Sequence, residues 1–382
     1  MRYYEKFRNE NFRNKRKMPI FAKKFVMRNP FKFGTIVEDE FFTDRISELS
    51  YIEQKLDSEN HIILISPRRF GKSSLVMKAV KNSGRQFIML NLQKVLSVQD
   101  LASNLLKEVF KLYPWEKIKH LMTHFRIVPT ISTNPMGDGI DVMFQPRANE
   151  VVALEDAMMT LEKIATPEKR LIVILDEFQE IMSIGKGLDK QMRAIMQLQH
   201  NINYVLLGSQ ESMMSEIFEH KKSPFYHFGT LMRLKKIPYD DFHQYIAQRL
   251  EPVMDGHSES VAAEVLAITK CHPYYTQQLA SQVWELAHYE GIKESVVEKA
   301  VERLSNIHDL DFERLWVSFN KMDRRVLKTL CTHGESLSTT ELPTSTLYSA
   351  VKRLMKKGFV IRENSYEIED PFFRRWIAKN QL

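Results

Sequence analysis

Two short groups of polar residues carry the chemistry that this sequence allows. The first is Gly71-Lys72-Ser73, and the second is Asp176-Glu177, about 100 residues further along the chain. A lysine can reach the β and γ phosphates of a nucleotide while a neighbouring serine hydroxyl ligates Mg²⁺. A carboxylate pair suits the same reaction, because Asp176 can complete the Mg²⁺ shell and Glu177 can orient and deprotonate a water. Together the two groups predict a site that binds a nucleoside triphosphate and hydrolyses it.

Both groups follow an apolar run with the length and branching of a buried parallel strand, at residues 62–65 and 171–175. After the first run, apolar residues recur at helical spacing from Leu75 to Val80. Strand, loop and helix with a Gly-Lys-Ser junction is the context that a phosphate-binding loop requires. Backbone N–H groups and the positive end of the helix then favour an anion. Ser66 stands where the pattern G-x-x-x-x-G-K-[ST] has its first glycine.

The loop supplies most of the candidate nucleotide contacts, which are Ser66, Pro67, Arg68, Arg69, Phe70, Gly71, Lys72, Ser73 and Ser74. Two of them leave alternatives open. Arg68 and Arg69 can touch phosphate or an acidic partner subunit, or they can be held by carboxylates of their own surroundings. Ser74 adds a second hydroxyl near the phosphates.

Further apolar runs at 87–90, 204–207 and 231–234 alternate with helical patterns. This alternation predicts an α/β fold with a parallel sheet covered on both faces, and the carboxyl ends of its strands form the ligand edge. Ser209 follows the run at 204–207. It is a candidate sensor of the γ-phosphate or the attacking water, with the N-cap of a following helix as the alternative.

Two local features accompany the core. An amphipathic helix begins near Arg45, with Ile46, Leu49, Ile52 and Leu56 expected on one face; Arg45 and Glu48 are either functional or simply solvated charges. Residues 126–145 read as a β-hairpin inserted between helices, with turn residues between two β-rich runs. The hairpin carries no chemistry that we can name.

The remaining chain predicts two more units. Residues 239–321 are helical throughout, as expected of a lid over the nucleotide, and residues 322–382 read as helix, helix and β-hairpin, which is the order of a winged helix. The second helix of this unit offers Lys352 and Arg353 as contacts for duplex DNA. A protein partner remains the alternative.

Composition limits the class of protein. Among the 382 residues, 43% are hydrophobic and 27% charged, as in a globular protein, and the two cysteines have no metal-binding or disulfide spacing, which suits a reducing cytoplasm. Ten of the 55 Lys and Arg residues lie in residues 1–28 with only two of the 48 acidic ones, so the rest of the chain is nearly neutral. Aromatic residues alternate with basic ones in this arm, a pattern that suits binding to nucleic acid. Disorder without a partner is an equal alternative, and so is a later start of the protein at Met18 or Met27.

The order of several short motifs resembles the archaeal-type ATPases among the signal-transduction ATPases with numerous domains, which are relatives of the AAA+ ATPases. The motifs are Asn29-Pro30-Phe31, Phe42-Thr43-Asp44-Arg45, Ser66 to Ser73, Leu175 to Gln179, Gly208-Ser209, Ser223 to Tyr226, His272 to Tyr275 and Asp370-Pro371-Phe372. The resemblance covers residues 29–376. It divides the chain into the arm, a P-loop core at 29–238, the lid and the winged helix.

The resemblance implies ATP with Mg²⁺ as the ligands, a lid whose His272 and Pro273 lie near the nucleotide, and a C-terminal winged helix. The sequence leaves a protein partner or self-association open. Two departures from the family pattern stand out. Lys270-Cys271 replaces a Gly-Gly pair before His272, and His227-Phe228 stands where an arginine is common. The arginine that would complete the site is therefore unassigned, with Arg193 and Arg233 as the candidates.

Overall fold

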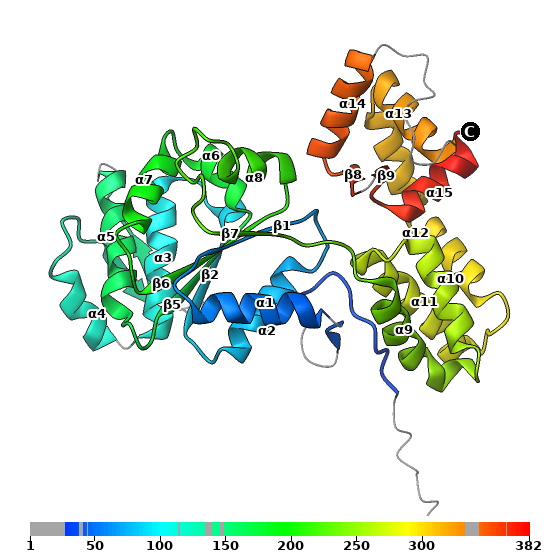
Figure 1. Ribbon diagram of the computed structural model, residues 1–382, viewed down its shortest axis with the longest axis horizontal. Helices are drawn as coiled ribbons and strands as arrows, with labels where there is room; N and C mark the ends of the chain where they lie inside the picture. The colour runs from blue at the N-terminus through cyan, green and yellow to red at the C-terminus, as the bar shows by residue number, and fades with distance from the viewer. Residues whose placement is uncertain are drawn as a thin grey trace, which may run out of the picture.

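The computed structural model describes residues 27–37, 41–43, 45–113, 115–133, 140–145, 149–332, 344–363 and 365–382. Its centre is a five-stranded parallel sheet in the order β2-β5-β6-β1-β7 (Figure 1). The strands are β1 (Ile62–Ile65), β2 (Phe87–Asn91), β5 (Leu171–Asp176), β6 (Ile202–Gly208) and β7 (Thr230–Arg233). The predicted α/β fold with a parallel sheet is confirmed.

Alternate residues of the central strands enter two different cores. In β1, Ile62 and Leu64 pack in one apolar cluster while Ile63 and Ile65 pack in the other. Both faces of the sheet are therefore covered, which explains why the strands read as continuous apolar runs rather than alternating ones.

Helices cover the sheet in two layers, and together they form what we call the sheet lobe. One face carries α1 (Ile46–Asp57) and α2 (Lys72–Asn82); the other carries α3 (Val98–Leu112), α5 (Glu150–Ile164), α7 (Leu188–Met196) and α8 (Glu211–Phe218), with α4 (Trp115–Met122) and α6 (Ile181–Ile184) beside them (Figure 1). The expectation for Ile46 is wrong, because its side chain is 71% exposed and the buried face of α1 consists of Ile52 and Leu56 with half-buried Leu49.

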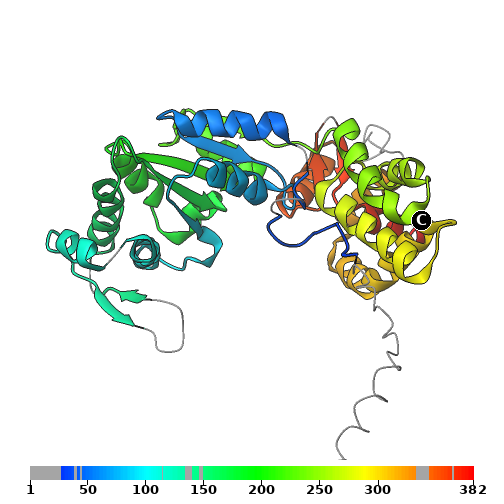
Figure 2. The ribbon, with the colours of Figure 1, turned by 90° about the horizontal axis from the view of Figure 1, so that it is seen from below.

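The inserted hairpin is present as β3 (Thr130–Thr133) paired antiparallel with β4 (Ile140–Met143). It projects from the end of the sheet lobe that is far from the later helices (Figure 2). The predicted turn at residues 134–139 lies outside the described residues.

The second half of the chain forms a helical lobe. It contains α9 (Tyr239–Met254), α10 (Ser258–Thr269), α11 (Pro273–Glu290), α12 (Val296–Ser318), α13 (Lys321–Thr332), α14 (Thr344–Lys356), the antiparallel pair β8 (Val360–Arg362) and β9 (Tyr366–Ile368), and α15 (Pro371–Asn380). One continuous apolar cluster runs from Phe242 in α9 to Ile377 in α15. This shared core makes α9–α15 a single packed body.

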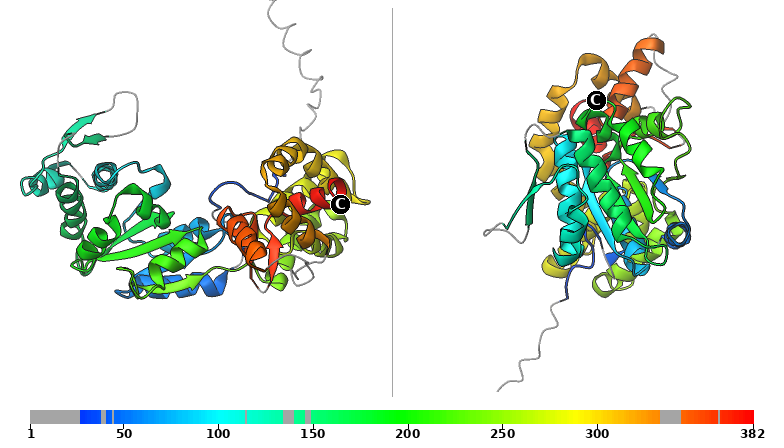
Figure 3. Two further views of the ribbon diagram at one scale, coloured as in Figure 1. Left: turned by 90° about the horizontal axis from the view of Figure 1, so that it is seen from above. Right: turned by 90° about the vertical axis from the view of Figure 1, so that its left-hand side faces the viewer.

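The two lobes lie end to end and are joined by two extended segments (Figures 2 and 3). One is residues 234–238, between β7 and α9. The other begins at Asn29, whose amide donates to Ser281 in α11, and reaches Val37, whose N–H donates to the Ser74 hydroxyl in α2. Of the basic arm predicted for residues 1–28, all but Met27 and Arg28 lies outside the described residues. Among the described residues, no helix is long and apolar enough to cross a membrane.

Candidate nucleotide site

The two chemical groups of the sequence meet at the carboxyl edge of the sheet. The Ser73 hydroxyl, in the first turn of α2, donates to Asp176 Oδ2 over 3.2 Å. The other oxygen of Asp176 accepts from the N–H of Glu177 at 2.9 Å. Burial raises the pKa of Asp176, and the charge of Glu177 raises it further. The start of α2 and the end of β5 therefore bring the Ser73 hydroxyl and the Asp176 carboxylate into direct contact.

Lys72 is buried beneath the same loop. Its ammonium donates to the carbonyl oxygens of Ser66 and Pro67, each at 3.1 Å. An ammonium has three donors, so one remains for a ligand. Burial lowers the pKa of Lys72, and the nearby carboxylates of Glu177 and Asp176 oppose that shift. The lysine is thus fixed in place by the loop that it serves.

Backbone geometry explains the departure at Ser66. Gly71 has φ +87°, which favours glycine, whereas Ser66 has no positive φ and tolerates its side chain. Ser66 is instead bonded to β6, the neighbour of β1 in the sheet, because its N–H donates to the carbonyl of Gly208 at 3.2 Å. Arg69 takes a left-handed conformation, with φ +64°. The loop therefore requires special conformations at Arg69 and Gly71, and none at the place of the missing glycine.

Glu177 is held by two side chains. Its Oε2 accepts from the Ser209 hydroxyl at 2.6 Å and from the Gln179 amide at 2.5 Å. Glu177 also has φ +54°, an uncommon conformation for a residue with a side chain. Gln210, not Ser209, occupies the N-cap position of α8, without a side-chain cap. The alternative in which Ser209 caps that helix is therefore wrong, and its hydroxyl faces Glu177.

A cavity of about 520 Å³ opens beside the loop, a volume typical of small-molecule sites. Its lining joins the loop and the carboxylates to the extended segment and to α11: Lys32 to Val37, Phe41 to Thr43, Arg45, Arg68 to Ser74, Asp176, Glu177, Ile237, Pro273, Tyr274 and Gln277. Pro273 lines this cavity, whereas His272 does not. Sequence analysis did not assign the wall from Lys32 to Val37 or the side chains of Tyr274 and Gln277 to the site, although Tyr274 belongs to the motif from His272 to Tyr275.

His272 lies behind the loop instead, only 1% exposed. Its ring packs edge-on against Phe70, with 4.9 Å between centroids, and its Nδ1 caps α11 by accepting from the N–H of Tyr274. Nε2 lies 3.3 Å from a carboxylate oxygen of Glu369 without the geometry of a hydrogen bond. Burial lowers the pKa of His272. A neutral His272 therefore fastens α11 to the loop through Phe70.

Arg69 also reaches across to α11. Its guanidinium donates to the Tyr275 hydroxyl at 3.2 Å and lies over the ring of Tyr274, with 4.6 Å to the centroid. Arg68 lines this cavity and a second one between the lobes. Among the described residues, Arg69 contacts these two tyrosines of α11 and forms no ion pair with a carboxylate of the sheet lobe, so the alternative in which local carboxylates hold it is wrong for Arg69.

Arg45 is structural rather than solvated. It is 4% exposed, pairs with Glu48 at 3.0 Å, and donates to the carbonyl oxygens of Phe70 and Lys235. It thereby links α1, the loop and the connection to α9.

The other candidate arginines are engaged elsewhere. Arg193 donates to the carbonyl of Pro224 and lies over the Phe228 ring, while Arg233 pairs with Glu219 at 2.6 Å. In the helical lobe, Arg353 is bonded through two nitrogens to Asp323, whose side chain is 2% exposed, whereas Lys352 is exposed. Of the two residues expected to contact DNA, Arg353 is therefore already bonded to Asp323, whereas the side chain of Lys352 is exposed to solvent.

The sheet order, the loop between β1 and α2 and the carboxylates on β5 define a P-loop ATPase. Residues 42–279 match the family described as an ATPase domain predominantly from Archaea. The chain belongs to this family, and it binds and hydrolyses ATP. Its fold is the predicted α/β fold with a parallel sheet.

Solved structures agree with this fold. The chain is 17% identical to a Walker-type ATPase of Pyrococcus abyssi, with a TM-score of 0.66 over 91% of this chain and 99% of that one. It is 15% identical to the Aeropyrum pernix ORC2 protein, solved as ADPNP and ADP complexes, with a TM-score of 0.55 over 91% of this chain and 96% of that one. A search of curated proteins gave no match to the sequence.

Proposed function

We propose that this chain is an ATPase whose nucleotide state sets the pose of the helical lobe and thereby the binding of a partner. The observation that carries the proposal is the 3.2 Å contact between Ser73 and Asp176, which brings the P-loop and the strand carboxylates into one site. The 520 Å³ cavity beside it has walls from both lobes. A nucleotide seated there would touch both, so its binding energy can depend on how the lobes are arranged.

Ser73 and Asp176 fit a magnesium ion, because Mg²⁺ prefers oxygen ligands and takes only one or two of them from the protein. Among the described residues, no cluster of three or more histidine, cysteine or acidic side chains offers a different metal site. When bound, the ion would neutralise charge on the phosphates. Burial favours the protonated form of Asp176, and a cation beside it would favour the ionised form.

Within the site, each side chain has a distinct role. Lys72 places its ammonium against the phosphates, held at the right depth by the carbonyls of Ser66 and Pro67. Glu177 orients the attacking water and accepts its proton. Ser209 and Gln179 hold the carboxylate of Glu177 in place, since both donate to its Oε2. Pro273 forms part of the wall, and His272 supports the loop from behind.

A second candidate function is duplex DNA binding by the C-terminal elements, with ATP as a switch. The order α13, α14 and the β8–β9 hairpin supports a winged helix. Lys352, Lys356 and Lys357 are exposed on and after α14, and Arg362 is exposed on the hairpin. These cations suit phosphate contacts.

The test is ATP turnover of the full chain as wild type, Lys72→Ala and Glu177→Gln, each with and without duplex DNA. We expect both variants to lose turnover by roughly 100-fold or more, with Glu177→Gln still binding nucleotide. Lys81→Ala, in the last turn of α2, and Glu180→Gln, three residues after Glu177, are the matched controls. Unchanged turnover in Glu177→Gln would refute its assignment, and stimulation by DNA would favour the second function.

A further inference from the structure

Three residues form a hydrogen-bonded relay from the phosphate loop to the base of α15. Arg69 donates to the Tyr275 hydroxyl at 3.2 Å, and that hydroxyl donates to Glu369 Oε2 at 2.7 Å. Arg69 belongs to the sheet lobe, whereas Tyr275 and Glu369 belong to the helical lobe, in α11 and directly before α15. The relay therefore crosses the junction between the lobes at the edge of the nucleotide site.

The positive charge of Arg69 matters to this relay because its far end carries two neighbouring carboxylates. Glu369 lies next to Asp370, the N-cap of α15, which accepts from the N–H groups of Phe372 and Phe373. Burial raises the pKa of Asp370 to about 6, and the charge of Glu369 adds to the shift. Two neighbouring carboxylates in a buried place repel each other, and the guanidinium of Arg69 is a cation that interacts with Glu369 across the junction.

The helical lobe has the construction needed to move as a unit. Its core is continuous from α9 to α15. Glu367 on β9 forms ion pairs with Lys270 at the end of α10 and with Lys236 in the connection. A displacement of Glu369 is therefore expected to move the whole helical lobe and not the β8–β9 hairpin alone.

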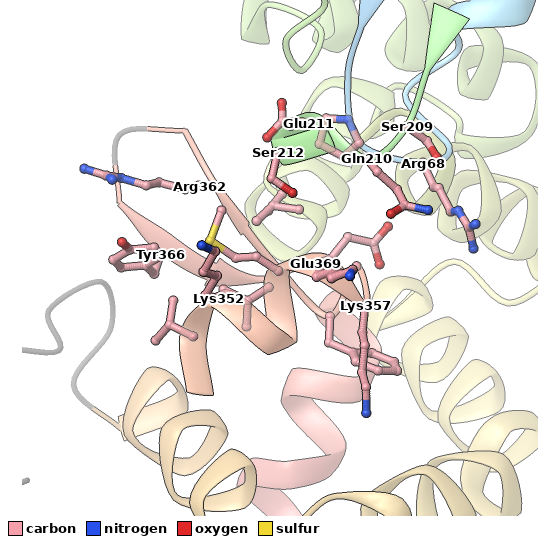
Figure 4. Close-up of a pocket in the computed structure, with 18 of the residues that line it drawn as sticks. Arg68, Ser209, Gln210, Glu211, Ser212, Lys352, Lys357, Arg362, Tyr366 and Glu369 are labelled. Atoms are coloured by element: carbon pink, nitrogen blue, oxygen red, sulfur yellow. The ribbon is translucent and has the colours of Figure 1, made fainter. Parts of the chain in front are cut away.

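One face of α14 lines the junction between the lobes. A cavity of about 640 Å³ separates the lobes, with Arg68, Ser209, Gln210 and Glu211 on the sheet side and Lys352, Lys357 and Glu369 on the helical side (Figure 4). This volume suits a small molecule and is too small for a macromolecule. Lys352 is thus turned toward the ATPase loops while the lobes are in this arrangement.

We propose that the Arg69–Tyr275–Glu369 relay is a latch that holds the helical lobe over the phosphate loop and opens when nucleotide phosphate takes Arg69. The inference rests on the proposed function, because it needs a triphosphate in the cavity that Arg69 lines. The tyrosine hydroxyl is a neutral partner, and a phosphate is a charged one whose hydrogen bonds to arginine are roughly twice as strong. Once Arg69 turns to phosphate, Glu369 loses the charge that offsets its own, and the junction between the lobes is weakened.

Competition for Arg69 gives the latch a measurable signature. If closing the latch and binding a triphosphate exclude each other, a variant that weakens the latch binds nucleotide more tightly, by reciprocal linkage. Ordinary structural damage beside a ligand site has the opposite effect.

The experiment measures the Kd of a non-hydrolysed ATP analogue with Mg²⁺ by calorimetry on the full chain. The variants are Tyr275→Phe, which keeps the buried ring, and Glu369→Gln, which keeps the shape but not the charge. Tyr289→Phe, an exposed tyrosine of the same helix, is the matched control. We expect the Kd to fall about tenfold in both latch variants, equivalent to ~1.4 kcal/mol, and to stay unchanged in the control. In an Arg69→Ala background, Tyr275→Phe should have no further effect.

Small-angle scattering supplies the second readout. The radius of gyration should rise with the analogue in wild type, and it should already be raised without nucleotide in both latch variants. Unchanged or weakened binding in Tyr275→Phe and Glu369→Gln overturns the latch, while tight binding by wild type leaves the ATPase assignment standing. Tighter binding without a change in the radius of gyration overturns the opening step. Failure of wild type to bind the analogue would instead refute the proposed function itself.

Discussion

The Ser209 hydroxyl lies 2.6 Å from Glu177 Oε2, so the tip of β6 orients the carboxylate at the tip of its neighbour β5. The parallel pairing of the two strands produces this contact, because their carboxyl ends fall at the same edge of the sheet. Gln179 adds a second donor from the turn that follows β5. The carboxylate of Glu177 is therefore held by two donors, despite its left-handed backbone.

Ser209→Ala should slow hydrolysis without weakening nucleotide binding. The substitution removes one of two donors to Glu177 and leaves the phosphate loop intact. We expect kcat to fall roughly tenfold, since one hydrogen bond to a charged group is worth about 1.5–3 kcal/mol and Gln179 retains part of the effect. KM should change less than twofold or so. Steady-state phosphate release checks this, with Ser212→Ala, an exposed serine in the first turn of α8, as the control. A rise in KM with kcat unchanged would place Ser209 in binding instead.

Two single-residue exchanges in the loop should have unequal effects. Ser66→Gly restores the usual pattern but changes no required conformation, so turnover should stay within about twofold and stability should fall by roughly 0.5–1 kcal/mol. Gly71→Ala forces a side chain into the left-handed region at a cost of roughly 1–2 kcal/mol. Its new methyl group meets no atom within 4 Å, so any lost activity comes from backbone distortion rather than from a clash. Turnover and chemical denaturation of both variants test the contrast, and equal behaviour would contradict it.

Acidification should destabilise the fold through His61. Its ring stacks on Phe228 with 4.3 Å between centroids, and its Nδ1 accepts from the N–H of Tyr204. Burial lowers the pKa of His61 to about 4, and the charge of Arg193 adds to the shift. The unfolded chain therefore binds a proton at a higher pH than the native one.

The resulting stability is fully present above pH 6.5 and is lost as the pH falls toward 4, by about 3 kcal/mol over that window. Denaturant unfolding between pH 4 and 7 measures this slope. His61→Asn keeps an acceptor without the titration, so its free energy of unfolding should fall by about 3 kcal/mol less over the same window. An unchanged slope would show that other groups govern acid unfolding.

Arg353→Ala and Lys352→Ala should separate stability from partner binding. Removing Arg353 leaves the buried carboxylate of Asp323 without its bidentate partner, which should cost about 1–3 kcal/mol of unfolding free energy. Lys352→Ala should leave stability unchanged within about 0.5 kcal/mol. If duplex DNA is the partner, Lys352→Ala should weaken binding and reduce its salt dependence. Thermal unfolding and salt-titrated DNA binding distinguish the two, and a stable Arg353→Ala protein would contradict the structural role.

The places of Gly71-Lys72-Ser73 and Asp176-Glu177 in the fold could be predicted from the sequence because these residues are close to strong structural signals. The strand at Ile62–Ile65 and the one ending at Asp176 are apolar runs that can only be buried. The second carries Asp176 at its end, and the first leads through a five-residue loop to Gly71-Lys72-Ser73. The same reasoning placed Ser209 at the end of β6. It could not choose between sensor and N-cap, because that choice depends on where β6 lies relative to Glu177.

Contacts between distant segments were beyond the sequence. Tyr275 and Glu369 are 94 residues apart, and nothing in their spacing indicates that they bond. Arg45 was left between two alternatives, since a charge at a helix start is usually solvated and only the fold shows that it is buried. Helix α15 was also missed, although Asp370 before Pro371 is a recognisable helix start with a proline at the first position.

The two connections between the lobes have a mechanical consequence. A lobe joined by one flexible connection can rotate freely, whereas two connections leave mainly rotation about the line that joins their anchoring points. Here one extended segment ends at Val37 against Ser74, and the other starts at Leu234, whose N–H donates to the carbonyl of Ile65. Both anchors lie at the two ends of the loop that surrounds the nucleotide cavity. If nucleotide state sets the pose of the helical lobe, as we propose, the ligand sits close to the pivot, and a small change there is amplified into a large sweep of α14.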